Sequence, residues 1–260
     1  MKCLPWLLMM LVLLPASIQA QEGDPLLFLR QTEAYHHTTA WKKQAAAEAQ
    51  ITVEFQERPL FAGQLLMRPN AARIRLTRDD GAVVVFDGAT AWLLPAGADW
   101  ERARFDALRW AYLWALPHKL EDHGARLESI GQKRLQGEPY DVARLTFDPG
   151  TGDSPDDTIE VYQNPETGQL KAAVLVAGRG REDADAVAEP IAIVYDQFQG
   201  VNDITVPHRW RFYRWSNESG LLGEPIGMVT LRDVVFPEPD ATKFAAPEGA
   251  RKLEKPSPHP

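Results

Sequence analysis

The sequence predicts a mainly β (α+β) fold, in which one curled antiparallel sheet is accompanied by two helices. From residue 51 onward, apolar and polar residues alternate with a period of two, which is typical of strands with one face in solvent. Turn signals such as Asp87-Gly88 and residues 164–168 separate these runs, and connections this short join antiparallel neighbours. One helical pattern, over residues 104–120, interrupts the strands.

The first 20 residues predict a cleavable secretory signal peptide. Lys2 is the only charged residue among them, residues 4–14 are almost wholly apolar, and a break that begins at Pro15 ends in the small residue Ala20. A membrane-spanning helix needs about 20 continuous apolar residues, and this stretch breaks sooner. We expect cleavage after Ala20 and export across the inner membrane. The single cysteine, Cys3, would be removed, so we expect a mature chain without a disulfide, a thiolate metal site or a lipid-bearing cysteine.

Residues 21–255 are expected to form a single domain, followed by a disordered tail at residues 256–260, because large all-β units run to about 200–250 residues. The first element of this domain is a predicted helix over residues 26–37. Asp24-Pro25 supplies a capping residue and a proline suited to the first helical position. The helix should end near Thr38, where β-branched residues weaken it.

The strands that follow are predicted from alternation and from short apolar runs between turn signals. Two acidic stretches, residues 148–157 and 178–189, are expected to be loops. The expected strands lie within residues 51–56, 64–68, 73–77, 83–86, 91–94, 127–133, 141–147, 158–162, 170–176, 191–198, 206–215 and 228–236.

The helical pattern in mid-chain is apolar on more than one side, which predicts that this helix is buried against the concave side of the sheet. Pro117 should end the helix, because the residue before a proline is disfavoured in helical conformation. The pattern consists of Phe105, Leu108, Tyr112 and Ala115 on one face and of Trp110 and Trp114 on another.

The charge of the chain excludes one class of function. The formal net charge is −8, and it becomes more negative when Lys2 is removed. Nucleic-acid binding calls for a basic face, and adsorption to anionic lipid by charge alone calls for basic clusters. We therefore expect no nucleic-acid partner and no stable membrane anchor.

Catalytic and metal-binding motifs are absent from the sequence. It contains no Gly-x-Ser-x-Gly elbow, no His-Glu-x-x-His pair and no glycine-rich phosphate loop. His36 and His37 are adjacent, so on a helix their side chains point about 100° apart and cannot ligate one ion from one face. We expect two exposed or half-buried imidazoles there, and the same for His118. No cofactor, no metal and no enzyme activity are expected, although His118 with Glu121 would be the pair to examine for one.

The aromatic residues admit two interpretations. Eight tryptophans are present, and several lie in or beside the mid-chain helix, while Trp210 and Trp215 border a later strand with Phe212 between them. Large aromatic side chains bury the most apolar area, so they fit a core that has no disulfides. They equally fit the wall of a pocket for a hydrophobic ligand, because ligand sites are concave and mostly apolar.

Four segments resemble those of a known superfamily. Residues 61–73, FAGQLLMRPNAAR, resemble a strand that ends in Arg-Pro and is followed by a basic strand. Residues 86–92, FDGATAW, resemble an Asp-Gly hairpin with a following tryptophan. Residues 116–120, LPHKL, resemble the close of an inserted helix, and residues 242–247, TKFAAP, a terminal Phe-x-x-Pro segment. The chain is similar in these segments to the LolA-like and LolB-like periplasmic lipoprotein carriers and to LolA-like domains of unknown function.

The resemblance implies an unclosed β-barrel of about ten or eleven strands, with helices covering an apolar hollow. In the carriers this hollow takes the acyl chains of a lipoprotein. The arginine linked to ligand release in the carriers has no certain counterpart, although Arg73 and Arg75 are candidates by their strand. The expected function is that of a soluble periplasmic monomer that binds a lipid, a lipoprotein or another hydrophobic ligand. The expected ligand-binding residues are Trp92, Leu108, Trp110, Tyr112, Trp114, Leu116, Trp210 and Phe212.

A different class of function stays open beside this one. If the side chains of the chain itself fill the hollow, the protein would be an envelope scaffold or sensor domain that binds another envelope protein. The two functions differ in whether the space between the helix over residues 104–120 and the sheet is open and apolar or is filled by side chains.

Overall fold

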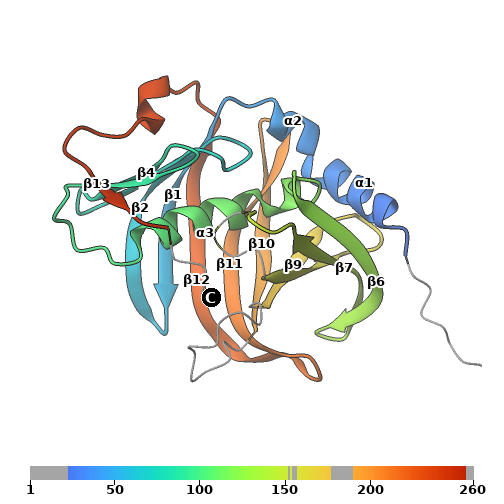
Figure 1. The fold of residues 1–260 in the computed structure, drawn as a ribbon. Helices are drawn as coiled ribbons and strands as arrows, with labels where there is room; N and C mark the ends of the chain where they lie inside the picture. The colour runs from blue at the N-terminus through green and yellow to red at the C-terminus, as the bar shows by residue number, and fades with distance from the viewer. Residues whose placement is uncertain (1–22, 152, 154–156, 177–189, 256–260) are drawn as a thin grey trace, which may run out of the picture.

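The structure is a computed structural model that describes residues 23–151, 153, 157–176 and 190–255 (Figure 1). The expected signal peptide, the expected loop over residues 178–189 and the expected tail over residues 256–260 lie outside the described residues. No helix in the described part of the chain is long and apolar enough to cross a membrane.

The described residues form one antiparallel sheet of thirteen strands in the order β13-β5-β4-β3-β2-β1-β12-β11-β10-β9-β8-β7-β6. In this part of the chain the edge strands β13 and β6 do not pair with each other, so the curled sheet is an unclosed barrel, as expected. It has more strands than the ten or eleven expected. The strands are β1 Ala47–Phe55, β2 Arg58–Met67, β3 Ile74–Arg78, β4 Val83–Phe86, β5 Ala91–Leu94, β6 Ala125–Leu135, β7 Glu138–Phe147, β8 Thr158–Gln163, β9 Leu170–Val176, β10 Ile191–Val201, β11 Ile204–Ser216, β12 Gly220–Val235 and β13 Arg251–Leu253.

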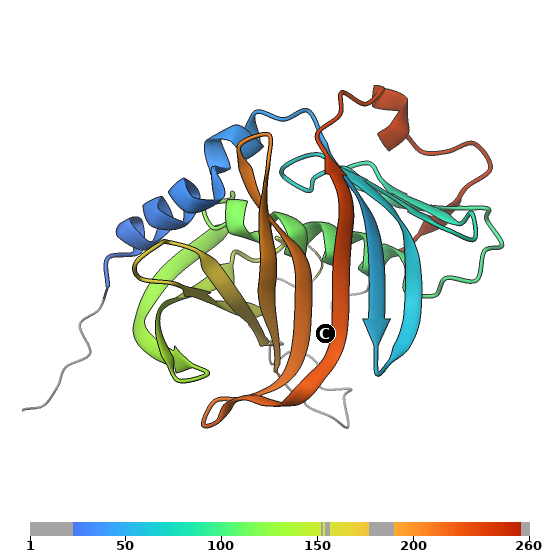
Figure 2. The same cartoon turned by 180° about the vertical axis from the view of Figure 1, so that it is seen from behind.

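The sheet consists of two meanders, β1 to β5 and β6 to β12, which are joined where β1 pairs with β12, and β13 is added at the free edge of β5. Strand β1 pairs with β2 on one side and with the long strand β12 on the other, so the first five strands meet the later ones at this pair (Figure 2). In the register of this pair, Ile51 faces Leu231 and Val53 faces Val229, and all four side chains are buried. The alternation that predicts β1 therefore places its apolar side in the concave core.

Two short helices precede the sheet. Helix α1, Pro25–His36, begins as expected, because the Asp24 carboxylate accepts a hydrogen bond from the backbone N–H of Leu26 at 2.9 Å. The helix ends close to Thr38, as expected, but the helical structure does not stop there. His37 adopts a left-handed conformation, and the chain then resumes as α2, Thr38–Lys42. Burial of Trp41 stabilises this extra turn, which the helix propensity of its residues does not predict.

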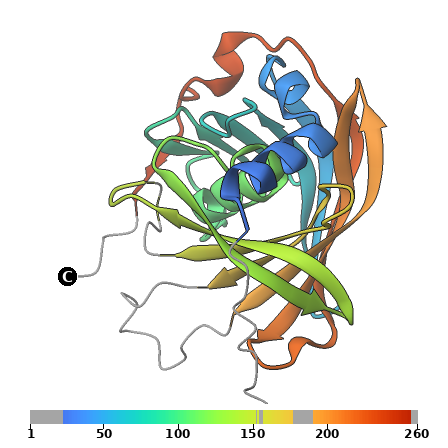
Figure 3. The same ribbon diagram turned by 90° about the vertical axis from the view of Figure 1, so that its right-hand side faces the viewer.

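Helix α3, Ala103–Ala115, crosses the concave side of the sheet and continues into a 3-10 turn, η1, Leu116–His118 (Figures 1 and 3). The predicted burial and the predicted end of the helix are confirmed. Four alanines at a spacing of four residues are fully buried, and α3 contacts β3, β4 and β5. Small side chains let the helix backbone approach the sheet closely. These alanines are Ala103, Ala107, Ala111 and Ala115.

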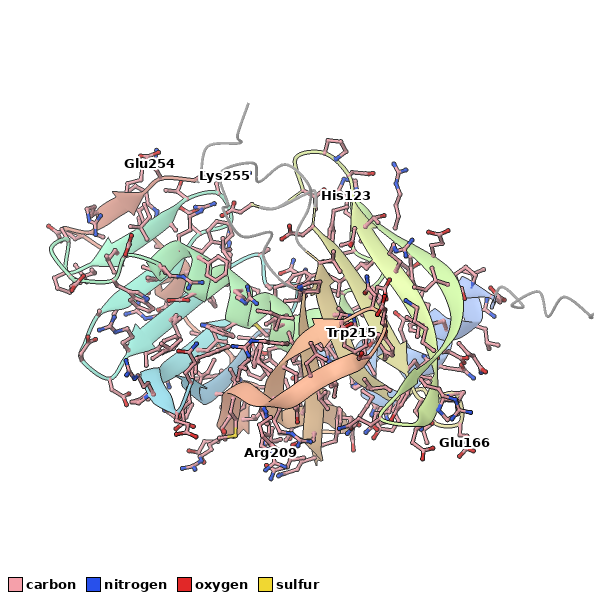
Figure 4. The ribbon with its side chains drawn as sticks, turned by 90° about the horizontal axis from the view of Figure 1, so that it is seen from below. His123, Glu166, Arg209, Trp215, Glu254 and Lys255 are labelled. Carbon is pink, nitrogen blue, oxygen red and sulfur yellow. The ribbon has the colours of Figure 1, made fainter. Side chains whose placement is uncertain are left out.

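The convex side of the sheet carries a smaller apolar cluster over strands β6 to β11. Tyr162 and Trp215 pack edge to face there, with their ring centroids 5.8 Å apart. Trp215 lies near the hairpin between β11 and β12 (Figure 4). The strands that carry both clusters are therefore apolar on both faces. Trp210 and Trp215, which the sequence groups together, belong to different clusters.

Candidate functional site

The aromatic side chains of α3 fill the space between this helix and the sheet. Trp110 is 3% exposed and Trp114 is 1% exposed. The Trp110 ring lies edge to face with Phe212 on β11, at 6.0 Å between centroids, and 6.5 Å from the ring of Phe61 on β2. The Trp114 ring lies 5.9 Å from that of Trp41 on α2. The protein's own side chains thus occupy the concave side beneath α3.

The structure brings all but one of the predicted ligand-binding residues together in this cluster. Leu116, Trp210 and Phe212 are fully buried in it, while Leu108 and Tyr112 are half-buried at its margin. The exception is Trp92, which is half-buried and donates its indole N–H to Asp87 at 3.1 Å.

Trp92 lies apart because of the pleat of β5. Its neighbours Ala91 and Leu93 are fully buried in the core under α3. Successive side chains of a strand point to opposite faces, so Trp92 faces away from that core. The prediction that groups it with the other residues used its aromatic character, which does not reveal the face on which it lies.

Three polar atoms of α3 are buried and have no hydrogen-bond partner among the described residues. They are the indole nitrogens of Trp110 and Trp114 and the hydroxyl of Tyr112. Burial raises the pKa of this hydroxyl, which keeps it neutral. By contrast, the indole of Trp41 donates to the carbonyl of Pro69 at 2.8 Å. A buried polar atom without a partner costs about 1–3 kcal/mol, so the polar side chains of α3 are incompletely satisfied in this structure.

Tyr195 on β10 attaches the C-terminal end of α3 to the sheet. Its hydroxyl donates to the carbonyl of Leu113 at 3.0 Å, and both residues are buried. In a continuous helix this carbonyl would accept from the N–H four residues later, but that residue is Pro117, which has none. Tyr195 is not among the residues that the sequence predicts for this site. Its only signal is the proline, which predicts a free carbonyl without identifying the donor.

Two buried histidines lie where α1, α2 and η1 meet. The ring of His118 stacks on Trp41 with centroids 4.4 Å apart, and its Nδ1 lies 3.0 Å from the Thr38 hydroxyl. The Nε2 of His36 accepts from the backbone N–H of Leu170 at 3.1 Å. Burial is the main cause that lowers the pKa of His36 to about 4, and it also holds the pKa of His118 well below its usual value. Both imidazoles are therefore neutral at neutral pH.

These positions correct the expectation of exposed or half-buried imidazoles, since His36 is fully buried and His118 is 6% exposed. His37, one residue further, is exposed. Glu121 is exposed as well, so the pair that it would form with His118 does not converge in the interior. Among the described residues, no group of three or more His, Cys, Asp or Glu side chains is placed to hold a metal ion.

Of the arginines around the Arg-Pro motif, Arg68 contacts the segment that follows α2. Its guanidinium donates to the carbonyl of Ala45 at 2.6 Å and lies 5.2 Å from the ring centroid of Phe244. Arg73 is exposed, and Arg75 lies between the inward-facing residues of β3. Phe244 belongs to the 3-10 turn η2, Ala241–Phe244, so Arg68 lies between two segments that are distant in sequence.

Two cavities lie on either side of α2. One, of about 440 Å³, is bounded by α2, the turn after β2 and η1. The other, of about 530 Å³, lies between the end of α1, α2 and the turn between β10 and β11. Neither is lined by an α3 residue. The first is lined by Trp41, Lys42, Gln44, Ala45, Arg68, Pro69, Asn70, His118, Lys119 and Asp122.

No family model and no curated protein matches this sequence. Solved structures with the same fold include the three that follow. A LolA superfamily protein from Nitrosomonas europaea is 11% identical with a TM-score of 0.57, over 86% of this chain and 98% of that one. A DUF1329 family protein from Desulfovibrio piger is 8% identical with a TM-score of 0.52, over 86% of this chain and 98% of that one.

The third structure is a domain named for outer membrane lipoprotein sorting, from Vibrio parahaemolyticus. It is 10% identical with a TM-score of 0.51, over 82% of this chain and 92% of that one. At these identities the likeness establishes the fold alone. The chain has a LolA-like fold, which confirms the fold that the resemblance of residues 61–73 and 86–92 implied.

Proposed function

We propose, from the LolA-like fold, that this protein is a periplasmic binder that holds an acyl chain or another hydrophobic ligand beneath α3. The expected signal peptide over residues 1–20 supports the location, and residues 21–255 would be the domain that acts there. The proposed lining consists of the aromatic cluster around Trp110, Trp114 and Phe212. Trp92 is excluded from it, because this residue faces away from the cluster.

The observation that carries the proposal is that the buried indole N–H groups of Trp110 and Trp114 on α3 have no hydrogen-bond partner among the described residues. A permanent core leaves few such atoms. If a ligand turns the indoles of Trp110 and Trp114 outward, their N–H groups reach water and this cost is relieved. The closed form is therefore less stable than its apolar area alone suggests, which suits a site that opens and closes.

The ligand must supply enough free energy to displace aromatic side chains. Each methylene that leaves water contributes about 0.8 kcal/mol, so a chain of about ten methylenes supplies about 8 kcal/mol before the cost of association. Displacing the edge-to-face contacts of Trp110 costs about 0.5–1.5 kcal/mol for each pair beyond the area it buries. These contributions are of comparable size, so binding requires that the chain occupy the volume that the indoles vacate.

The test is a titration of delipidated mature protein with dodecanoate, followed by tryptophan fluorescence. We expect binding at micromolar concentrations, with a response that falls in Trp110→Phe and in Trp114→Phe. Trp92→Phe is the matched control, because this indole is bonded to Asp87 outside the cluster and should leave the response unchanged. If dodecanoate does not bind at micromolar concentrations and the tryptophan emission does not change, the proposal is refuted.

A second candidate, the envelope scaffold or sensor, is favoured by one observation. In the closed form, aromatic rings occupy the concave side, and neither cavity beside α2 is lined by an α3 residue. Hydrogen exchange separates the two candidates. If the amides of α3 exchange as slowly as those of β11 and no hydrophobic ligand binds, the interior is a permanent core and the scaffold is the better account.

A further inference from the structure

The cavity between α2, the turn after β2 and η1 concentrates positive charge. Three cationic side chains line it, Lys42, Arg68 and Lys119, against one carboxylate, Asp122. The whole chain carries a formal net charge of −8, so this excess of cations runs against its composition. A concave site with an excess of one charge attracts a ligand of the opposite charge.

The three cations keep hydrogen-bond donors for a ligand. Lys119 is 9% exposed and donates to the Asn70 carbonyl at 2.6 Å and to Asp122. Arg68 donates from one nitrogen to the carbonyl of Ala45. Lysine has three donors and arginine five, so each retains capacity beyond these bonds.

Lys42 is the most adaptable of the three. Its side chain is 52% exposed, and its ammonium lies 3.4 Å from Glu33, a residue that lines the cavity on the opposite side of α2. Exposed ion pairs contribute about 0–1 kcal/mol, so Lys42 can leave Glu33 at little cost.

The inner wall of this cavity is the edge of the aromatic cluster. Trp41 and His118 line it, and their rings are stacked. The Trp41 ring in turn contacts that of Trp114 on α3, which is buried in the main core cluster. One layer of aromatic side chains therefore separates the cationic cavity from the proposed site of the acyl chain.

We propose that this cavity binds the anionic headgroup, a phosphate or a carboxylate, of the amphiphile whose chain lies beneath α3. The inference rests on the proposed function and assigns to it a ligand class: an anionic amphiphile rather than a neutral lipid. The headgroup accepts hydrogen bonds from Lys119, Arg68 and Lys42, and the chain passes the Trp41 edge toward Trp114. Charge-assisted hydrogen bonds of this kind are about twice as strong as neutral ones.

The test compares two ligands with the same chain, dodecyl phosphate and dodecanol, by isothermal titration calorimetry on mature protein. We expect dodecyl phosphate to bind at least about tenfold tighter, with a preference that falls as salt is raised. Lys42→Ala should lower this preference about threefold. Lys43→Ala is the matched control, because Lys43 is the adjacent exposed lysine and lines the other cavity. Lys119→Met should lower the preference further.

The outcomes distinguish the headgroup site from the function on which it rests. Equal affinities for the two ligands, unchanged in Lys42→Ala, overturn the headgroup site and leave the proposed function standing. If neither ligand binds but inorganic phosphate does, in a manner that depends on Lys42, the site takes a free anion and the lipid-binding proposal fails. If inorganic phosphate binds weakly and fails to displace dodecyl phosphate, the lipid is the source of the anion.

Discussion

Replacing Tyr195 by phenylalanine isolates the hydrogen bond that attaches α3 to the sheet. The ring stays, the hydroxyl leaves, and the carbonyl of Leu113 loses its donor. Because Pro117 offers no N–H, the helix cannot satisfy this carbonyl itself. A buried acceptor is left without a partner, for which the expected loss in the free energy of unfolding is about 1–3 kcal/mol.

Tyr162→Phe is the matched control. Tyr162 is as fully buried as Tyr195, but its hydroxyl has no hydrogen-bond partner among the described residues. Removing that hydroxyl relieves a desolvation cost, so the expected change is near zero or a small gain in stability. Both substitutions keep a buried ring of the same size, and the difference between them therefore reports the hydrogen bond to Leu113.

The assay is urea unfolding at 25 °C, followed by circular dichroism, with equal m-values as the condition for comparison. Hydrogen exchange supplies a second readout. The amides of α3 should exchange faster in Tyr195→Phe than in the wild type, and at the wild-type rate in Tyr162→Phe. If both variants lose the same stability within about 0.5 kcal/mol, the bond to Leu113 contributes nothing and the reasoning is refuted.

Three further predictions concern the core and its contacts. The free energy of unfolding should fall as the pH drops from about 6.5 to about 4, because the unfolded chain binds a proton that the buried His36 imidazole resists. This loss is on the order of 3 kcal/mol, and His36→Gln should remove it while the slope that the buried His118 contributes remains. Gly63→Ala should cost about 3 kcal/mol or abolish soluble expression, because a Cβ there would lie 2.1 Å from a backbone oxygen of β3. Arg104→Met should cost about 2 kcal/mol in urea unfolding, because it removes both hydrogen bonds, of 2.7 and 2.9 Å, to Asp153.

Each of these has a control in the same chain. His123→Gln changes an exposed histidine (Figure 4) and should keep the pH profile of the wild type. Gly200→Ala adds a Cβ with no atom within 4 Å, so equal losses at Gly63 and Gly200 would contradict the steric argument. Arg126 pairs with Asp148 in solvent, and a cost as large for Arg126→Met as for Arg104→Met would contradict the role of burial.

Much of the sheet follows from local pattern. Strands β4, β5 and β9 begin and end at the residues that the sequence predicts, because turn residues border short apolar runs on both sides. Strand β13 is not predicted from the sequence. Its three residues show no alternation, and its partner β5 is far away in the sequence. Helix α2 was missed because five residues carry too little local signal, and its stability comes from the burial of Trp41.

The candidate site was predictable in composition but not in detail. Two faces of α3 contain tryptophan or tyrosine, and the sequence correctly predicts that the helix is buried. The alanines at every fourth position decide how closely α3 approaches the sheet. This spacing is present in the sequence, but the prediction of a buried helix rests on the large apolar side chains alone. Contacts between distant residues, such as that of Tyr195 with Leu113 or the stacking of Trp41 on His118, depend on the tertiary fold, and no local pattern encodes them.

The unpaired edges of the sheet have a mechanical consequence. In a closed barrel the strand number and the stagger of the hydrogen bonds set the girth, so widening it means breaking part of the ladder. Strands β13 and β6 do not pair in the described part of the chain, so a change in twist can draw them apart while every strand pair is kept. The width of the concave side can therefore change without the loss of a strand pair, and under the proposed function the same sheet would accommodate ligands of different thickness.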